Sequence, residues 1–117
     1  MAVQKQDGLF TDARPGGADL TGKERLLAKR DSNGDLVLAQ VGDIVAGVIQ
    51  EGKAAARWST IMTGGMTKVI AGETISEGVR VQAGADGVAV AGTTNSFGVS
   101  RNQVNSGELL EVIMDQS

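Results

Sequence analysis

Seven residues near the start of the chain have the spacing of a phosphate-binding loop. Gly17 to Lys23, which read GADLTGK, fit the pattern G-x-x-x-x-G-K, in which backbone N–H groups and a lysine surround a phosphate. The next residue is Glu24, where a serine or threonine would ligate magnesium, and no apolar strand precedes the loop. A chain with 17 glycines produces such a match by chance, so we predict no nucleotide site here.

The acidic segment Asp31–Asp35, which reads DSNGD, looks like the beginning of a calcium-binding loop. Its glycine comes too early for that loop. Gly42 also occupies the position where a bidentate glutamate belongs. The segment is therefore predicted to be a polar hairpin turn.

The chain has no cysteine and no histidine, which removes the commonest nucleophiles, general bases and metal ligands. Its other carboxylates lie at turns or alternate with apolar residues, as on a solvated face; they are Asp43, Glu51, Glu73, Glu77, Glu108 and Glu111. No pair of them has a spacing that indicates general acid–base catalysis. We expect a protein that is not an enzyme and that binds no cofactor and no metal ion.

The remaining candidates are residues suited to protein contacts. Trp58, the only tryptophan, follows Arg57 and fits equally an interface anchor and a tryptophan at the edge of the core. Leu9 and Phe10 form an apolar pair in a polar segment, so they need a surface to be buried against, either their own body or a neighbouring molecule. With the basic residues of that segment, the candidate contact residues are Lys5, Leu9, Phe10, Arg14, Arg57 and Trp58.

The pattern of the chain predicts an all-β fold. Residues 1–20 show no helical or strand periodicity and contain the only proline, which predicts an extended N-terminal arm. Short apolar stretches then recur every eight to twelve residues between glycine and Asx turns, as is typical of a small β-sandwich or barrel-like domain. Asn33-Gly34 and Asp86-Gly87 predict two hairpins with type I′ turns. We expect at most one short helical turn, at Ala54–Arg57.

Superposing the two Asx-Gly turns reveals an internal repeat with an offset of about 51 to 53 residues. The matching segments are residues 26–28 with 79–81, 36–38 with 88–90, 45–48 with 96–99, and 58–62 with 109–114. The sequence thus predicts a single β domain, residues 21–117, built from two pseudo-symmetric four-strand repeats. These cover residues 21–66 and 67–117, and the arm of residues 1–20 precedes them.

Charge and hydropathy bear on the partners of the chain. Residues 1–30 carry six Lys and Arg against four Asp and Glu, whereas the remainder carries five against ten. An acidic chain with three aromatic residues is a poor binder of nucleic acid. The longest apolar run, Ile44 to Ile49, is far shorter than a membrane span, and the N-terminus has no apolar signal-peptide core. We expect a soluble, unprocessed protein without nucleic-acid or membrane partners.

The second half of the chain has a pattern that resembles the capsid decoration (cement) proteins of tailed bacteriophages. The pattern is of the form V-x-A-G-x-x-I-x-x-G-x-x-V, D-G-x-V, x-G-V and A-G-E-x-x-x-V, repeated twice. Here it is carried by the segments 68–81, 86–90, 97–99 and 106–114. The resemblance covers the chain from about Leu20 to Met114. The first half follows the pattern more loosely around residues 20–27.

The resemblance implies a small β-rich structural protein without catalytic activity. Its implied partners are the major capsid protein and further copies of itself, in a homotrimer at threefold and quasi-threefold positions. The implied location is the outer surface of the expanded capsid of the virion, after synthesis in the host cytoplasm. Deleting residues 2 to about 20 is expected to weaken capsid binding and to leave the fold intact.

Two other classes of binding protein remain open. A lipoyl or biotinyl carrier domain also has two quasi-symmetric halves, but it presents a lysine at a hairpin tip, and the tips at residues 31–35 and 85–87 have none. A β-sandwich module that binds protein or carbohydrate is the second class. Carbohydrate-binding sites are usually lined by several exposed aromatic residues, and the three aromatic residues of this chain are too few for such a site.

Overall fold

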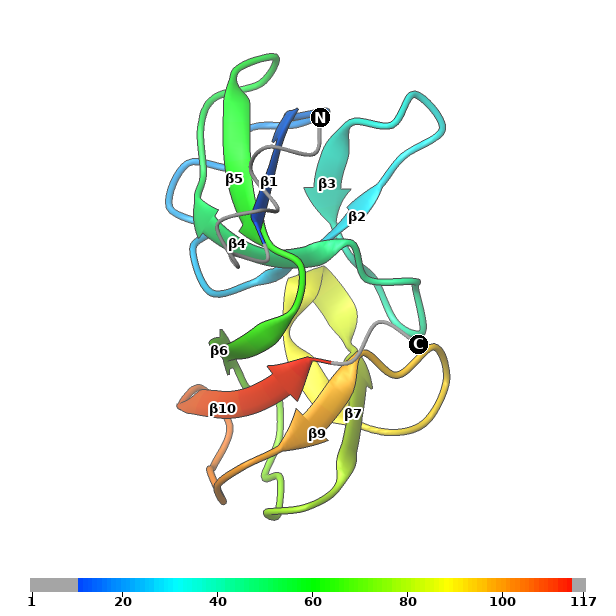
Figure 1. The fold of residues 1–117 in the computed structure, drawn as a ribbon, viewed down its shortest axis with the longest axis vertical. Helices are drawn as coiled ribbons and strands as arrows, with labels where there is room; N and C mark the ends of the chain where they lie inside the picture. The colour runs from blue at the N-terminus through cyan, green and yellow to red at the C-terminus, as the bar shows by residue number, and fades with distance from the viewer. Residues whose placement is uncertain (1–10, 115–117) are drawn as a thin grey trace.

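The protein folds into two antiparallel five-stranded sheets, each forming one lobe, as seen in a computed structural model that describes residues 11–114. Figure 1 shows the lobes stacked along the longest axis of the molecule. The strands of the first lobe are β1 (Thr11–Pro15), β2 (Leu27–Arg30), β3 (Leu36–Leu38), β4 (Gly47–Glu51) and β5 (Trp58–Met62). The second lobe consists of β6 (Gly65–Ile70), β7 (Arg80–Ala83), the 3-10 turn η1 (Ala85–Gly87), β8 (Ala89–Ala91), β9 (Gly98–Ser100) and β10 (Leu109–Met114). The predicted all-β class is confirmed.

The internal repeat has five strands rather than the predicted four. The strand order is β1-β5-β4-β2-β3 in the first sheet and β6-β10-β9-β7-β8 in the second, so each strand of one lobe has its counterpart five strands later. The two sheets meet between Met62 and Gly65, close to the predicted division at residues 66 and 67. Each sheet curls so that its two edge strands approach each other. A parallel bridge joins Gly16, just after β1, to Leu36 of β3, and another joins Ala71, just after β6, to Ala89 of β8. This curling gives each lobe its barrel-like shape.

The added strand of the first lobe comes from the predicted N-terminal arm. Residues 11–15 pair with β5 in register from Thr11 opposite Met62 to Pro15 opposite Trp58, and Leu20 is buried in the core of the first lobe. The arm therefore does not extend to residue 20, and deleting residues 2–20 would remove a strand. Gly16 donates its N–H to the carbonyl of Arg57, on the side of β5. Successive residues of a strand direct their backbone N–H groups to opposite sides, so the nitrogen of Pro15, which carries no hydrogen, faces the open edge of the sheet. A proline is tolerated at this position of an edge strand.

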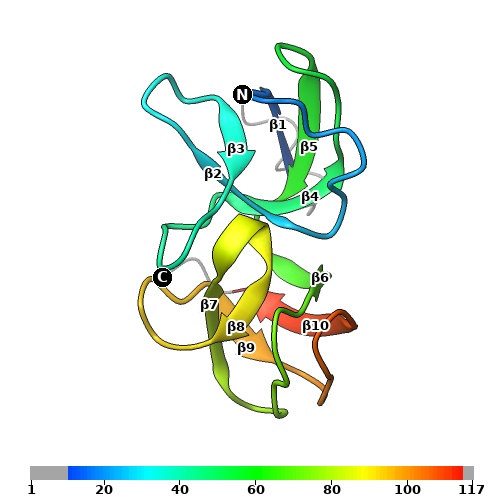
Figure 2. The same ribbon diagram turned by 180° about the vertical axis from the view of Figure 1, so that it is seen from behind.

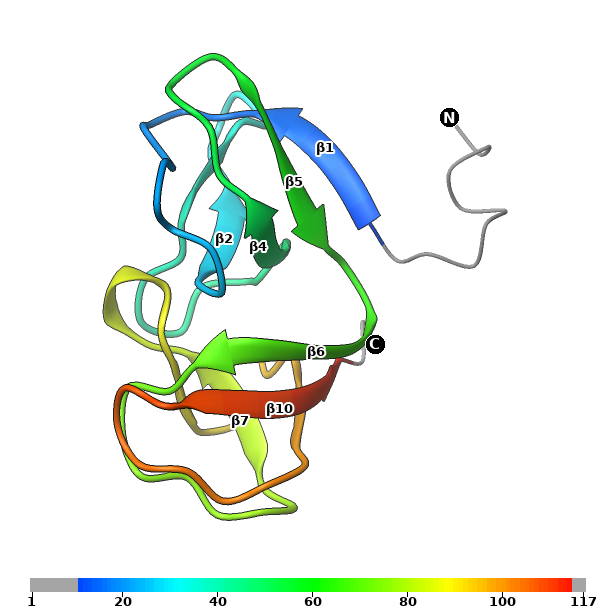
Figure 3. The ribbon, with the colours of Figure 1, turned by 90° about the vertical axis from the view of Figure 1, so that its left-hand side faces the viewer.

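The two lobes share a hydrophobic core and form one body. The larger cluster of buried side chains combines four residues of the first lobe, which are Leu27, Ala39, Val45 and Val48, with residues of the second lobe such as Val69 and Phe97. Backbone hydrogen bonds cross the junction from Gly87 N to Ala39 O (2.8 Å) and from Ile70 N to Arg25 O (2.8 Å). Figure 3 shows β6 and β10 running beneath the first lobe. A smaller cluster, formed by Leu20, Ala28, Leu36, Ile49 and Ile61, fills the first lobe alone.

The two Asx-Gly turns connect the predicted hairpins, β2–β3 and β7–β8, but their geometries differ. Asp86 and Gly87 both have positive φ, 55° and 85°, as the predicted type I′ turn requires. In the Asn33-Gly34 turn only Gly34 has a positive φ. There the Asp31 carboxylate accepts the N–H groups of Asn33 (2.8 Å) and Asp35 (3.0 Å), and this Asx turn replaces the predicted type I′ geometry.

The predicted helical turn at Ala54–Arg57 is not helical. Arg57 N donates to Ala54 O at 3.0 Å, which closes a β-turn, and Ala56 has a left-handed φ of 68°. Among residues 11–114 the only helical segment is η1, and it contains the left-handed Asp86.

Candidate interaction surfaces

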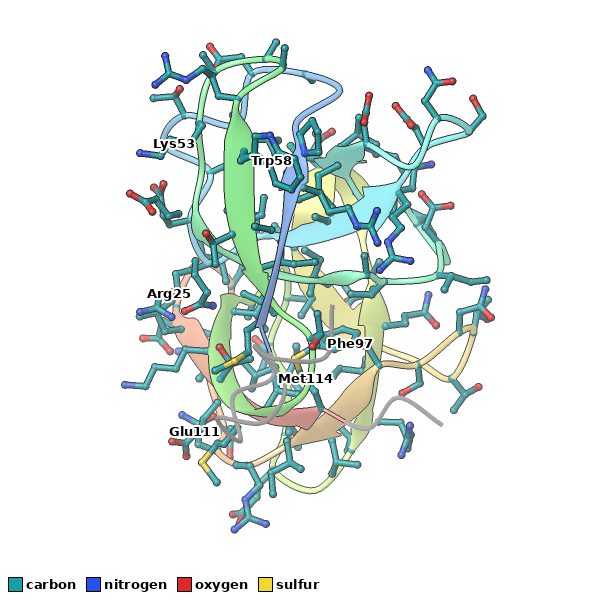
Figure 4. All side chains as sticks on the ribbon, turned by 45° about the horizontal axis from the view of Figure 1, so that its top comes forward. Arg25, Lys53, Trp58, Phe97, Glu111 and Met114 are labelled. Carbon is teal, nitrogen blue, oxygen red and sulfur yellow. The ribbon has the colours of Figure 1, made fainter. Side chains whose placement is uncertain are left out.

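Trp58 is a surface residue. It is the first residue of β5, and the strand alternates so that Ser59 and Ile61 are buried whereas Trp58 faces outwards. Its side chain is 64% exposed, and Figure 4 shows it on the outside of the first lobe. Such exposure is unusual for tryptophan, which is highly buried on average. Of the two interpretations that the sequence allowed, the structure excludes a tryptophan at the edge of the core, and the interface anchor stays a prediction.

Two neighbours extend the surface around Trp58. Pro15 lies directly opposite it on β1, and the adjacent Arg57 is exposed. The corresponding position of the second lobe carries Leu109, which lies opposite Ile70 and is also exposed. Each lobe thus presents an apolar pair where its last strand begins, and only the first lobe has an aromatic ring there.

Arg14, another predicted contact residue, does not join Trp58. Arg14 is half-buried and lies opposite the buried Ser59, so alternation along β1 puts it on the opposite face of the sheet from Trp58. Lys5, Leu9 and Phe10 lie outside the described residues.

Two further exposed apolar features were not predicted. Val41 and Ile44, in the loop between β3 and β4, are 69% and 73% exposed. Met66 on β6 and Ile113 on β10 face each other across neighbouring strands and are 50% and 37% exposed. Apolar alternation marks these residues as strand-like but does not say which face a partner element covers.

The segment that fits the phosphate-loop pattern has a structural role. Leu20, in its middle, is buried and donates its N–H to Lys53 O at 2.9 Å. Ile75 in the second lobe is likewise buried and donates to Val104 O at 3.0 Å. Gly17 to Arg25 is thus the counterpart of Gly72 to Gly78, with two residues more, and it leads into strand β2 rather than into the helix of a nucleotide site.

The carboxylates with perturbed pKa values serve as hydrogen-bond acceptors. The Lys29 ammonium, followed by the N–H of Gln40, lowers the pKa of Asp43, and the N–H of Gly52 lowers that of Glu24. These shifts favour the charged form, whereas a general acid needs a raised pKa. Within residues 11–114 no cluster of acidic side chains is arranged to hold a metal ion, and no helix is long and apolar enough to cross a bilayer.

The fold has a known counterpart. No protein-family model and no curated protein sequence matches the chain. Among solved structures, the chain is similar to the head fiber gp8.5 N base in bacteriophage phi29, with a TM-score of 0.71 and 18% sequence identity. The match covers 92% of this chain and 94% of the other. This likeness shows that the complete two-lobed body is a shared fold.

Proposed function

We propose that the protein is a structural component of a bacteriophage head, where it binds the outer surface of the expanded capsid and stabilises it. The observation that carries this proposal is the fold likeness to a phage head fiber base, because it spans nearly the whole of both chains. The decoration-protein pattern in segments 68–81 and 106–114 supports it independently. In this role the partners are the major capsid protein and two further copies of the chain, in a homotrimer at threefold and quasi-threefold positions.

The composition of the chain fits this location. A net charge of −3 gives no general attraction to nucleic acid or to anionic membranes. A role in stabilising the shell needs a rigid body rather than a catalytic centre, and the shared core of the two lobes provides such a body.

Trp58 is the best candidate for the shell contact. A tryptophan that is 64% exposed and flanked by Pro15 and Arg57 has the composition of an interface hot spot, in which aromatic and arginine side chains dominate the binding energy. Removing such a side chain costs about 2 kcal/mol or more, which corresponds to about thirtyfold in affinity for one contact. Three contacts in a trimer would multiply this loss through avidity.

The test is co-sedimentation of the purified protein with expanded and unexpanded capsids. We expect saturable binding to expanded shells only, and a loss of at least about thirtyfold in affinity for Trp58→Ala. Leu109→Ala is the matched control, because it truncates the corresponding exposed residue of the second lobe; we expect it to bind like the wild type. Binding that Trp58→Ala leaves unchanged would exclude Trp58 as the contact. Absence of wild-type binding to either shell would overturn the proposed function.

The arm is tested by a shorter deletion than the sequence suggested. Removing residues 2–10 preserves β1 and Leu20, whereas removing residues 2–20 would open the sheet and the core of the first lobe. We expect the shorter variant to fold and to bind expanded shells more weakly.

A further inference from the structure

The loop between β3 and β4 projects two aliphatic side chains from the junction of the lobes. Val41 and Ile44 are the most exposed large hydrophobic residues of the described chain, at 69% and 73%. Figure 2 shows this loop beside the second lobe, between β3 and β7. Exposing two such side chains within four residues leaves unburied apolar area that a partner could cover.

Hydrogen bonds hold this loop in one conformation. The second lobe makes two hydrogen bonds to the backbone of the loop: Gly42 N donates to Ala83 O (3.1 Å), and the Asn95 side chain donates to Gly42 O (2.9 Å). Within the loop, Asp43 accepts the N–H of Gln40 (2.8 Å) and pairs with Lys29 (2.9 Å). Val41 and Ile44 are therefore presented by a rigid support, so that a partner would lose little conformational entropy in binding them.

The internal repeat shows that the fold does not require apolar residues here. Ala39 and Gly92 are equivalent, because they donate to Leu27 O and Arg80 O at matching positions of β2 and β7; Ala46 and Phe97 are equivalent in the same way. The intervening segment reads QVGDIV in the first lobe and TTNS in the second. The first lobe thus carries a loop two residues longer, with aliphatic residues where the second lobe has only polar ones.

A complementary apolar surface lies on the outer face of the second sheet. Met66, Ile113 and Val99 form a row across β6, β10 and β9, because Ile113 lies opposite both of the others. The equivalents of Ile113 and Val99 in the first lobe are Met62 and Val48, which are packed into the core shared by the lobes. The same face of the repeat is therefore covered in the first lobe and uncovered in the second.

We propose that Val41 and Ile44 of one copy of the chain dock onto the Met66–Ile113–Val99 row of a second copy. The two surfaces lie on different parts of one molecule, because the loop is held beside Ala83 of β7 whereas Met66 lies on the edge strand β6, which β10 and β9 separate from β7 in the sheet. The contact is thus head-to-tail, and it closes into a ring when the rotation between copies permits. That the ring has three members rests on the proposed function.

The charges around the two surfaces allow this contact. Asp43 beside the exposed pair is neutralised by Lys29, and next to the acceptor row Lys68 lies opposite Glu111. Lys68 and Glu111 together add no net charge beside the acceptor row, so the two surfaces do not repel each other electrostatically.

Two paired variants of the full chain test the proposal. Val41→Thr/Ile44→Asn gives the loop the polar character of the second lobe, and Met66→Thr/Ile113→Thr removes the acceptor. We expect the wild type to form a ring of defined mass by analytical ultracentrifugation at about 100 µM, and each variant to be monomeric at the same concentration. Because all four positions are exposed, both variants should keep the thermal stability of the wild type within a few degrees. A circular dichroism melt verifies this.

Mixing the two variants distinguishes a head-to-tail contact from a symmetric one. Each variant retains one half of the contact, so an equimolar mixture should form a dimer and nothing larger. A wild type that is monomeric at this concentration, variants that assemble like the wild type, or a mixture that stays monomeric would each overturn the proposal. Trp58→Ala should assemble normally, so a failure of shell binding and a failure of self-assembly give separate readouts.

Discussion

The contact between the lobes can be tested at Gly87 with an internal control. Gly87 and Gly34 occupy equivalent turns, and both are in the left-handed region, with φ of 85° and 81°. An added Cβ at Gly34 would meet nothing within 4 Å, whereas at Gly87 it would lie 2.9 Å from Leu27 O and 3.1 Å from Leu26 Cβ of the first lobe. Substitution by alanine therefore carries the same backbone strain at both positions, and lobe–lobe crowding at only one.

The expected magnitudes follow from these two contributions. Left-handed backbone costs an alanine about 1 to 2 kcal/mol, which is the whole effect expected for Gly34→Ala. Gly87→Ala adds about 1 to 3 kcal/mol for overpacking against main-chain atoms that cannot turn away. For a chain of this size 1 kcal/mol corresponds to about 3 to 6 °C in Tm, so the Gly87 variant should melt roughly 3 to 18 °C below the Gly34 variant.

Thermal unfolding followed by circular dichroism measures both variants. The wild type should unfold in a single transition, since the lobes share one core. Equal destabilisation of the two variants, or separate transitions for the two lobes, would refute the packing of η1 against β2 described above.

Two further predictions concern backbone strain and pH. Arg25 has a φ of 70° at the position where the second lobe has Gly78. Arg25→Gly should therefore raise the free energy of unfolding by roughly 0.5 kcal/mol, whereas Arg25→Ala, which keeps the backbone strain, should not raise it. Urea titration of both variants measures the difference. The lowered pKa values of Asp43 and Glu24 stabilise the fold above the ordinary carboxyl pKa of about 4, and this contribution is lost as the pH falls through the lower folded-state values. Melting temperatures should therefore drop below about pH 4, and less steeply for Asp43→Asn; an identical acid profile for that variant would contradict the role given to Lys29.

Much of the fold could be predicted because local signals coincide with it. The Asx-Gly dipeptides located both hairpins, and the superposed turns gave the correct equivalence of β2 with β7 and of β5 with β10. The turn type at Asn33 was wrong, since the Asp31 side chain offers the backbone an alternative set of hydrogen bonds.

Strand β1 could not be predicted because it is an edge strand with few apolar residues. Its sequence, TDARP, shows no alternation, and it is held by pairing with β5, which a local pattern does not reveal. Its counterpart β6 was visible as an apolar stretch but could not be assigned to the repeat without β1.

The candidate surfaces could be predicted only in part. Trp58 stood out as a lone aromatic, yet its exposure depends on which face of β5 packs inwards, and this is decided by tertiary contacts. Val41 and Ile44 belong by composition to a strand-like apolar run, and their exposure follows from hydrogen bonds to Ala83 and Asn95, which are far away in the sequence.

The central claim is that this fold serves on the outside of a phage head, and co-sedimentation with capsids tests it most directly. The purified protein should saturate expanded shells at about one copy per shell subunit, as the resemblance to decoration proteins implies, and should leave unexpanded shells bare. Equal binding to both forms, or binding to neither, would contradict the account.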